Sequence, residues 1–177
     1  MSDDQAPQQA APEIPPQGAA PDLIHMELKN GRVAIRLRPD LAPAHAERFR
    51  TLAAEGFYDN TPFHRVIDGF MAQGGDPTGT GTGGSKLPDL KSEFTREARF
   101  VRGTLGAART AHPHSANSQF FIMFAPAPSL DGQYTIFGEV VEGMELVDQI
   151  KRGAGGNGMV SEPDRIVTLR PAAAPDA

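Results

Sequence analysis

The chain has neither cysteine nor tryptophan among its 177 residues, and only two of its residues are tyrosines. Without cysteine it forms no disulfide framework and no thiolate metal site, and it has no cysteine nucleophile. No segment approaches the roughly 18 consecutive apolar residues of a membrane-spanning helix. The N-terminus also lacks the basic and apolar regions of a secretory signal. These absences predict a cytoplasmic protein that makes no contact with a membrane.

An excess of positive charge is also lacking, since 17 basic residues stand against 22 acidic ones. All the basic residues lie between positions 22 and 170, and four of the acidic residues lie outside that range. The body of the chain is therefore nearly neutral. A nucleic-acid-binding domain presents a basic surface to the phosphate backbone. The charge balance predicts that nucleic acid is not a partner.

Composition divides the chain into three parts. Residues 1–21 contain five prolines among alanine and glutamine, and Ile14 is their only large aliphatic residue. Such a segment buries too little apolar surface to offset the entropy lost when it becomes ordered. We predict a disordered tail over residues 1–21, a single domain over 22–170, and a frayed C-terminal end over 171–177.

The central domain consists mostly of short segments with the patterns of strands. Val33, Ile35 and Leu37 alternate with more polar residues, which is typical of a half-buried strand, and the preceding Asn-Gly pair is a hairpin signal. We predict strands at Leu23–Leu28, Val33–Leu37, Phe63–Ile67, Phe70–Gln73, Gly103–Ala108, Gln119–Phe124, Thr135–Val141 and Arg165–Arg170, and helices from Pro43 to Gly56 and over Met144–Ile150. Many short strands with only two helices predict a mainly-β barrel or sandwich.

Several local patterns suggest chemistry that their surroundings do not support. The glycine patterns at 79–84 and 153–158 each meet a proline before any helix begins, which favours loops over dinucleotide binding. The His-Pro-His sequence at 112–114 has no third ligand close by, which favours a solvated loop over a metal site. His64 is more typical of a packed histidine with hydrogen-bonded ring nitrogens than of a general base.

A stronger pattern comes from several blocks taken together. Residues 63–76 read FHRVIDGFMAQGGD, residues 118–122 read SQFFI, residues 130–132 read LDG, and residues 137–144 read FGEVVEGM. In the second block, strand alternation predicts that one of the adjacent Phe120 and Phe121 faces the core and the other faces outward. Together the blocks resemble the cyclophilin-type peptidyl-prolyl cis-trans isomerases, over about residues 23–169. The sequence ARTA at 108–111 is similar to the bacterial, cytoplasmic branch of that family.

The resemblance implies a closed eight-stranded antiparallel β-barrel capped by two α-helices. It also implies an enzyme that rotates Xaa-Pro peptide bonds and assists protein folding without a cofactor or metal. Its partners would be proline-containing peptides and unfolded or flexible protein segments. The enzyme itself would be a monomer. The implied catalytic residues are Arg65 and Gln73, and the implied substrate-binding residues are Phe70, Met71, Ala108, Arg109, Thr110, Gln119, Phe121, Leu130 and Tyr134.

Two positions depart from the eukaryotic members of the family. Ser129 stands where those proteins have the tryptophan that recognises cyclosporin, and Tyr134 replaces a histidine of the pocket. Loss of the indole predicts weak inhibition by cyclosporin. Two other hypotheses remain open at this point. The same pocket would also serve a non-catalytic module that captures proline-containing loops, and a nucleotide-dependent enzyme would require dinucleotide binding.

Overall fold

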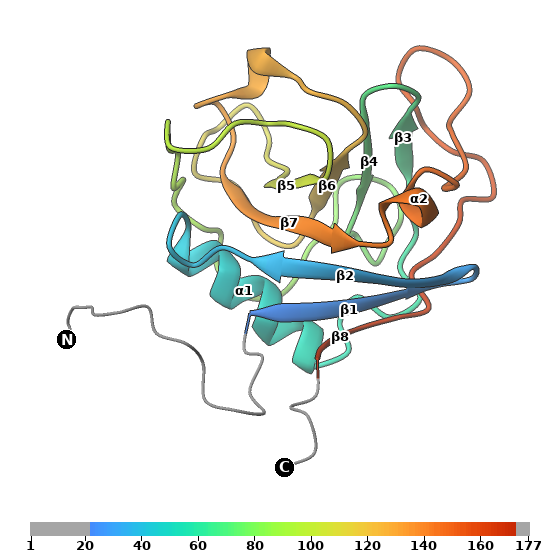
Figure 1. Ribbon diagram of the computed structural model, residues 1–177, viewed down its shortest axis with the longest axis horizontal. Coiled ribbons are helices and arrows are strands. Elements are labelled where there is room, and N and C mark those ends of the chain that lie inside the picture. Colours follow the sequence, from blue (N-terminus) through green and yellow to red (C-terminus); the bar gives the residue numbers. More distant parts are fainter. Residues whose placement is uncertain (1–21, 173–177) are drawn as a thin grey trace.

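A computed structural model describes residues 22–172 of the chain (Figure 1). Its strands are β1 (Leu23–Leu28), β2 (Gly31–Leu37), β3 (Arg65–Ile67), β4 (Met71–Gly74), β5 (Thr104–Ala107), β6 (Phe120–Met123), β7 (Ile136–Glu142) and β8 (Thr168–Pro171). Its helices are α1 (Pro43–Ala54), the 3₁₀ turn η1 (Pro128–Leu130) and α2 (Met144–Val147). All paired strands are antiparallel and follow the order β3-β4-β6-β5-β7-β2-β1-β8. The predicted mainly-β architecture is confirmed.

The sheet curls but does not close, so the prediction of a closed barrel is wrong. Strands β3 and β8 end the strand order, and they do not pair with each other in the described part of the chain. The segment 153–166 lies between them and makes scattered backbone bonds, such as Val66 N to Gly158 O at 2.8 Å and Phe63 N to Asp164 O at 2.9 Å. Its four glycines and Pro163 oppose a regular strand. Irregular backbone therefore fills the gap that a barrel strand would close.

The first hairpin forms as the Asn-Gly pair predicts. Leu28 pairs with Gly31, so Lys29 and Asn30 form a two-residue connection between β1 and β2. Gly31 has a φ of +144°, a conformation that side chains with a Cβ rarely adopt. Strand β2 therefore begins two residues before the predicted Val33.

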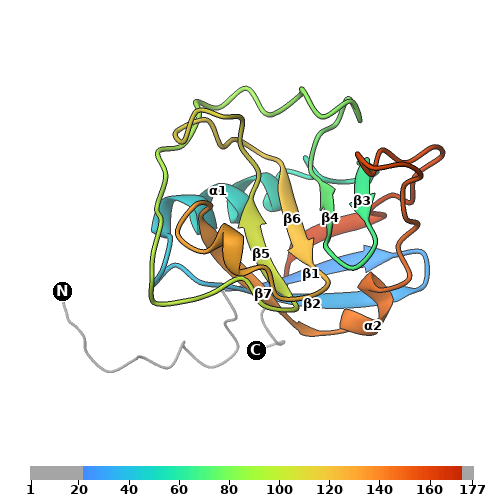
Figure 2. The ribbon, with the colours of Figure 1, turned by 90° about the horizontal axis from the view of Figure 1, so that it is seen from above.

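One hydrophobic core lies inside the curl of the sheet, and α1 packs against it. In the helix predicted from Pro43 to Gly56, the apolar residues at three- and four-residue spacing are Ala46, Phe49 and Ala53, and all three are buried. The Phe49 ring lies 5.2 Å from that of Phe120 on β6 and 5.1 Å from that of Phe137 on β7, between ring centroids. Helix α2 lies well away from α1, towards the other side of the sheet in both views (Figures 1 and 2). Both helices therefore cover the core, as predicted.

The ends of the chain define where the described domain stops. The predicted tail at 1–21 lies outside the described residues, and so do 173–177. Pro171, which was predicted to lie in the frayed end, is the last residue of β8, and the Ala172 amide donates to Leu23 O at 2.8 Å.

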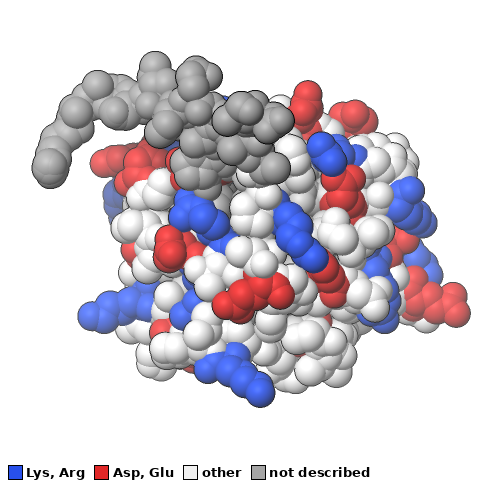
Figure 3. Space-filling model, turned by 90° about the horizontal axis from the view of Figure 1, so that it is seen from below, with Lys and Arg blue, Asp and Glu red and all other residues white. Residues whose placement is uncertain are grey.

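No helix within residues 22–172 is both long and apolar enough to span a membrane. On the face shown in Figure 3, positive and negative side chains are interspersed.

Candidate active site

A hollow of about 220 Å³ lies on the outer side of the sheet, over β3, β4 and β6. Figure 2 shows these strands and β5 side by side. The residues that line the hollow are Arg65, Phe70, Met71, Gln73, Ala108, Arg109, Phe121, Leu130 and Tyr134. All were predicted site residues, and the remaining two, Thr110 and Gln119, line a hollow beside it. We call the first the proline hollow, because the resemblance implies that its residues receive a proline ring, and the second the polar hollow.

The alternation of β6 sends side chains to both sides of the sheet. Phe120 and Ile122 belong to the core inside the curl, whereas Phe121 and Met123 belong to a second apolar cluster on the outer side. This confirms that one residue of the phenylalanine pair faces inward and the other outward. Although Phe121 faces outward, it is only 5% exposed, because other aromatic rings surround it. It forms the floor of the proline hollow.

Two further rings hold the Phe121 floor in place. Phe100 stacks on Phe121 with ring centroids 5.6 Å apart, and Tyr134 meets it edge-on at 5.6 Å. Sequence reasoning missed Phe100, which lies in an irregular segment before β5. The Phe100 amide donates to Asp131 Oδ1 at 2.7 Å, next to Leu130 of the hollow. Local sequence patterns carry no signal for such a contact between distant segments.

The predicted strand Phe63–Ile67 would put Phe63 on the same face as Arg65 and Ile67, and that placement of Phe63 is wrong. Phe63 is wholly buried in the inner core, whereas Arg65 lines the proline hollow. The reason is that β3 begins only at Arg65, so strand alternation does not extend back to Phe63. Ile67, two residues after Arg65 on β3, packs in the outer cluster as expected.

The Arg65 guanidinium is fixed at the edge of the proline hollow. Its Nε donates to Asn157 O at 2.9 Å, and its Nη1 donates to Gln73 Oε1 at 3.2 Å. Gln73 lies directly opposite Arg65 in the pairing of β3 and β4. Within residues 22–172 Arg65 makes no ion pair with a carboxylate. An arginine at this position could instead serve only as one half of a surface ion pair, and the structure gives that alternative no support.

Hydrogen bonds continue from Gln73 into the polar hollow. Gln73 Nε2 donates to Gln119 Oε1 at 3.0 Å, and Gln119 Nε2 donates to the carbonyl oxygens of Gly81 at 3.0 Å and Gly83 at 2.9 Å. An unbroken chain of bonds thus connects Arg65 to the glycine-rich loop. The orientation of the guanidinium depends on the position of that loop.

Asp76 holds the glycine-rich loop from below. Its side chain has no exposed surface and accepts bonds from the amides of Thr78 at 2.8 Å, Gly81 at 2.6 Å and Gly83 at 3.0 Å. Burial alone would raise the pKa of Asp76, but these bonds and that of the Thr78 hydroxyl lower it to about 2. An aspartate followed by Pro-Thr-Gly is typical of a turn-forming residue, and the bond to Thr78 is of that kind. The bonds to the two glycines were missed.

His64 lies beside the same loop and is buried, as predicted. Its Nδ1 nevertheless has no hydrogen-bond partner among the described residues, so the prediction of satisfied ring nitrogens is wrong. Burial lowers the pKa of His64, although the charge of Asp76 acts in the opposite direction. The ring is therefore held neutral within the core beneath Gly81.

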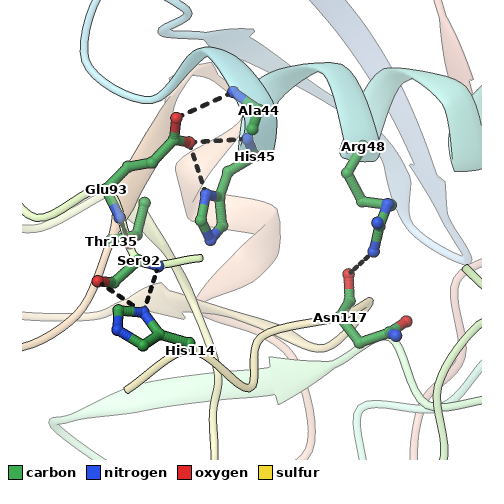
Figure 4. A network of polar contacts seen from close by, with 8 residues as sticks. All are labelled: Ala44, His45, Arg48, Ser92, Glu93, His114, Asn117 and Thr135. Carbon is green, nitrogen blue, oxygen red and sulfur yellow. Dashed lines mark hydrogen bonds and ion pairs between the residues drawn. The ribbon is translucent and has the colours of Figure 1, made fainter. Parts of the chain in front are cut away.

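The polar hollow is larger, about 490 Å³, and shares Gln73, Ala108 and Arg109 with the proline hollow. Asn117 shapes its far wall, because its Oδ1 accepts the Ser85 amide at 2.8 Å and its Nδ2 donates to Leu87 O at 2.9 Å. Arg48 of α1 in turn donates to Asn117 O at 3.3 Å (Figure 4). The two hollows form one continuous depression in which a peptide has room on both sides of Gln73.

The remaining sequence patterns form loops, as predicted. Neither glycine pattern opens a helix, so the nucleotide-dependent hypothesis finds no support. His112 and His114 are exposed, and their Nδ1 atoms accept the amides of His114 and Ser92, each at 3.1 Å. No group of three or more residues able to ligate a metal occurs within the described part of the chain.

Comparison with known proteins agrees with this geometry. A family profile described as "Cyclophilin type peptidyl-prolyl cis-trans isomerase/CLD" matches residues 23–170. A probable peptidyl-prolyl cis-trans isomerase of Brucella suis is 53% identical over 158 residues, covering 82% of this chain and 80% of that protein. Human peptidyl-prolyl cis-trans isomerase-like 1 is 38% identical over 139 residues, covering 77% of this chain and 84% of that protein.

Solved structures give the same result. A Cryptosporidium parvum cyclophilin type isomerase, crystallised in the presence of the dipeptide Ala-Pro, superposes with a TM-score of 0.78 at 30% identity. That match covers 85% of this chain and 99% of the other. The family profile spans nearly all of the described domain, and the bacterial relative shares more than half of the aligned residues. The chain therefore belongs to the cyclophilin-type peptidyl-prolyl cis-trans isomerase family.

Proposed function

We propose that the enzyme rotates Xaa-Pro bonds by directing the Arg65 guanidinium at the proline nitrogen of a peptide whose ring occupies the proline hollow. The observation that carries this mechanism is the placement of Arg65. It lies at the rim of a hollow that contains the apolar side chains of Phe70, Met71, Phe121 and Leu130, it is held by Gln73 and the Asn157 carbonyl, and no described carboxylate neutralises it. A related isomerase crystallised with Ala-Pro supports proline-containing peptides as substrates.

The chemistry requires no nucleophile. Rotation is slow because the C–N bond has partial double-bond character, and the uncatalysed Xaa-Pro step takes roughly 10–100 s at 25 °C. In the twisted transition state the amide loses its resonance, and the proline nitrogen regains a lone pair. A donor aimed at that nitrogen stabilises the twisted form more than either planar form. Arginine suits the task because it keeps its charge at every working pH.

The two hollows divide the remaining work. Phe70, Met71, Phe121 and Leu130 enclose the proline ring, while Gln73 and its hydrogen-bonded partner Gln119 orient the guanidinium. Ala108 and Thr110 lie along the polar hollow, where they contact the peptide backbone next to the proline. One side of the Xaa-Pro bond is thus held while the other turns, and this positioning adds to the stabilisation of the twisted form by Arg65.

The shape of the site also favours a type of substrate. The hollows are open depressions on the outer side of the sheet, so a proline within a folded, buried segment has no access to them. Unfolded and flexible protein segments present proline in the required extended form. We infer that the enzyme assists protein folding and that it acts as a monomer, as the resemblance to the family implies.

Substitution of Arg65 tests the mechanism. Exchange NMR on an Ala-Pro peptide should show that Arg65→Ala lowers the isomerisation rate about 100-fold or more, the usual loss when an electrostatic donor is removed. Arg65→Lys should recover little of it, because an ammonium lacks the planar fork. The melting temperature should stay close to that of the wild type.

Arg36→Ala is the matched control, since Arg36 is an exposed arginine of β2 that lines neither hollow. It should leave both the rate and the melting temperature unchanged. Unchanged turnover in Arg65→Ala would reject the assignment. A wild-type protein that binds the peptide without accelerating exchange would instead support the non-catalytic module.

A further inference from the structure

Arg109 stands where the two hollows meet, and the mechanism above does not use its side chain. It lines both the proline hollow and the polar hollow. Its guanidinium carbon lies 4.6 Å from the ring centroid of Tyr134 and 5.9 Å from that of Phe94. Both distances fall within the range of cation–π contacts. The cation therefore lies close to two aromatic rings at the point where the two hollows meet.

Backbone carbonyls fix the orientation of this guanidinium. Nε and Nη2 donate to Gln133 O at 3.1 and 2.7 Å, and Nη1 donates to Thr110 O at 2.9 Å and Ala111 O at 3.4 Å. A guanidinium has five N–H donors, so these four bonds leave one N–H of Nη2 for a ligand. The carbonyls orient the charge but do not cancel it. An arginine that is already ordered loses little entropy when it binds an anion.

The aromatic rings around Arg109 are themselves positioned by a polar network. The Glu93 amide donates to Thr135 Oγ1 at 2.9 Å, which ties the backbone beside Phe94 to the backbone beside Tyr134. The Glu93 carboxylate accepts the amides of Ala44 and His45 at the start of α1, together with His45 Nδ1 at 2.7 Å (Figure 4). The segments that carry Phe94 and Tyr134 are thus connected by hydrogen bonds to helix α1, which packs against the core.

The charge around the site contrasts with that of the whole chain. The chain carries a net charge of −5, yet the proline hollow is lined by two arginines and by no acidic residue. The polar hollow adds a single carboxylate, Asp89, which accepts Asn117 Nδ2 at 3.1 Å. Within residues 22–172 neither Arg65 nor Arg109 forms an ion pair with a carboxylate. A peptide in the proline hollow therefore meets two positive charges that no described carboxylate pairs, and Asp89 is the single acidic residue that lines the neighbouring polar hollow.

We propose that Arg109 determines substrate specificity by favouring peptides with an Asp or Glu close to the proline, on the side of the chain that enters the polar hollow. The inference rests on the proposed function, in which the proline occupies the neighbouring hollow. The peptide carboxylate accepts the free N–H of Nη2 and lies in the field of both arginines. The interaction is present before the bond twists, so it lowers KM more than it raises kcat.

The test uses the full-length enzyme and exchange NMR, which avoids the sequence preference of a coupling protease. The substrates are matched proline peptides with Glu, Gln or Lys at each of the two positions before and the two positions after the proline. At low salt, the wild type should prefer Glu over Lys at one of these positions by about fivefold or more in kcat/KM. The preference should appear in KM and should shrink in about 0.5 M salt.

Arg109→Gln should reduce that ratio of Glu to Lys peptides to about twofold or less. Because the ratio is taken within one variant, any common loss of activity cancels. Arg36→Gln, which also removes one positive charge but lies outside both hollows, should keep the wild-type ratio. A melting curve of each variant confirms that it is folded.

A wild-type enzyme that isomerises all the peptides equally well would overturn this inference and leave the proposed function intact. The same conclusion would follow if Arg109→Gln retained the preference for Glu. A wild-type enzyme that isomerises none of the peptides would overturn the proposed function and, with it, this inference.

Discussion

Ser129 lies exposed in η1, beside the Leu130 side chain that lines the proline hollow. The eukaryotic members that this chain resembles have a tryptophan there, whose ring contacts cyclosporin. A serine offers almost no apolar surface, whereas a tryptophan buries roughly 150–250 Å². We therefore expect the side chain at position 129 to affect recognition of the drug without affecting the proposed role of Arg65.

We predict that cyclosporin inhibits the wild-type enzyme only at micromolar concentration or above, and that Ser129→Trp tightens inhibition about tenfold or more. The peptide isomerisation assay, run with increasing cyclosporin, measures both constants. Ser129→Ala is the matched control and should behave like the wild type. A nanomolar inhibition constant for the wild type would refute the prediction.

Strand β5 shows how an element supports the site without lining it. An added Cβ at Gly106 would lie 2.5 Å from Cζ of Phe121 and 2.6 Å from Cε1 of Phe100. Only a residue without a side chain lets these two rings stack behind the proline hollow. The glycine of β5 thus sets the depth of the floor formed by Phe121 on β6.

We expect Gly106→Ala to push the Phe121 ring towards the hollow. The KM for an Ala-Pro peptide should rise several-fold, and overpacking should lower the free energy of unfolding by about 1–3 kcal/mol. Peptide kinetics and urea unfolding measure the two effects. Gly156→Ala is the control, because a Cβ there has no neighbour within 4 Å, and it should change neither quantity. An unchanged KM in Gly106→Ala would contradict the role assigned to the floor.

At the scale of the whole molecule, the lowered pKa values of four groups all make the folded protein less stable as the pH decreases. Burial lowers the pKa of His45 and of His64 below the ordinary 6.5, against opposing effects of Glu93 and Asp76. Burial alone would raise the pKa of Glu93, but bonds from His45 and the Ala44 amide lower it. The pKa of Asp76 is about 2 instead of 3.8. At each of these groups the unfolded chain binds its proton at a higher pH than the folded chain does.

The free energy of unfolding should therefore be highest above about pH 7 and fall as the pH decreases. The contribution of the two histidines is lost as the pH falls through 6.5 towards their lower folded values. The contribution of Glu93 to stability is lost as the pH falls below 4.5. The contribution of Asp76, on the order of 1–2 kcal/mol after screening, is lost between about pH 4 and pH 2. Urea unfolding at a series of pH values measures this profile.

Asp76→Asn should flatten the lowest part of the profile and lower stability at neutral pH. Asp68→Asn removes a similar charge from an exposed turn and should keep the slope. Stability that stayed constant between pH 7 and 4 would contradict the prediction.

Local patterns predicted those features whose causes lie within a few residues of one another. The Asn-Gly pair gave the hairpin, and alternation separated Phe120 from Phe121. The ends of helices and strands that depend on tertiary packing were predicted less accurately. The predicted helix Met144–Ile150 ends at Val147, and the chain continues in turns in which the amides of Gln149 and Ile150 bond three residues back. A segment this short has too few bonds of its own to fix where a helix ends.

By itself, the sequence of this protein determined the mainly-β architecture, the family and the residues around the proline hollow, because strand periodicity and dense motifs are local properties of the chain. Only the tertiary structure decided that the sheet stays open, that Asp76 holds the loop behind Gln119, and that Phe94 and Tyr134 enclose Arg109. These features join segments far apart in the chain. Their stability depends on burial and on long-range hydrogen bonds, which exist only once the chain has folded.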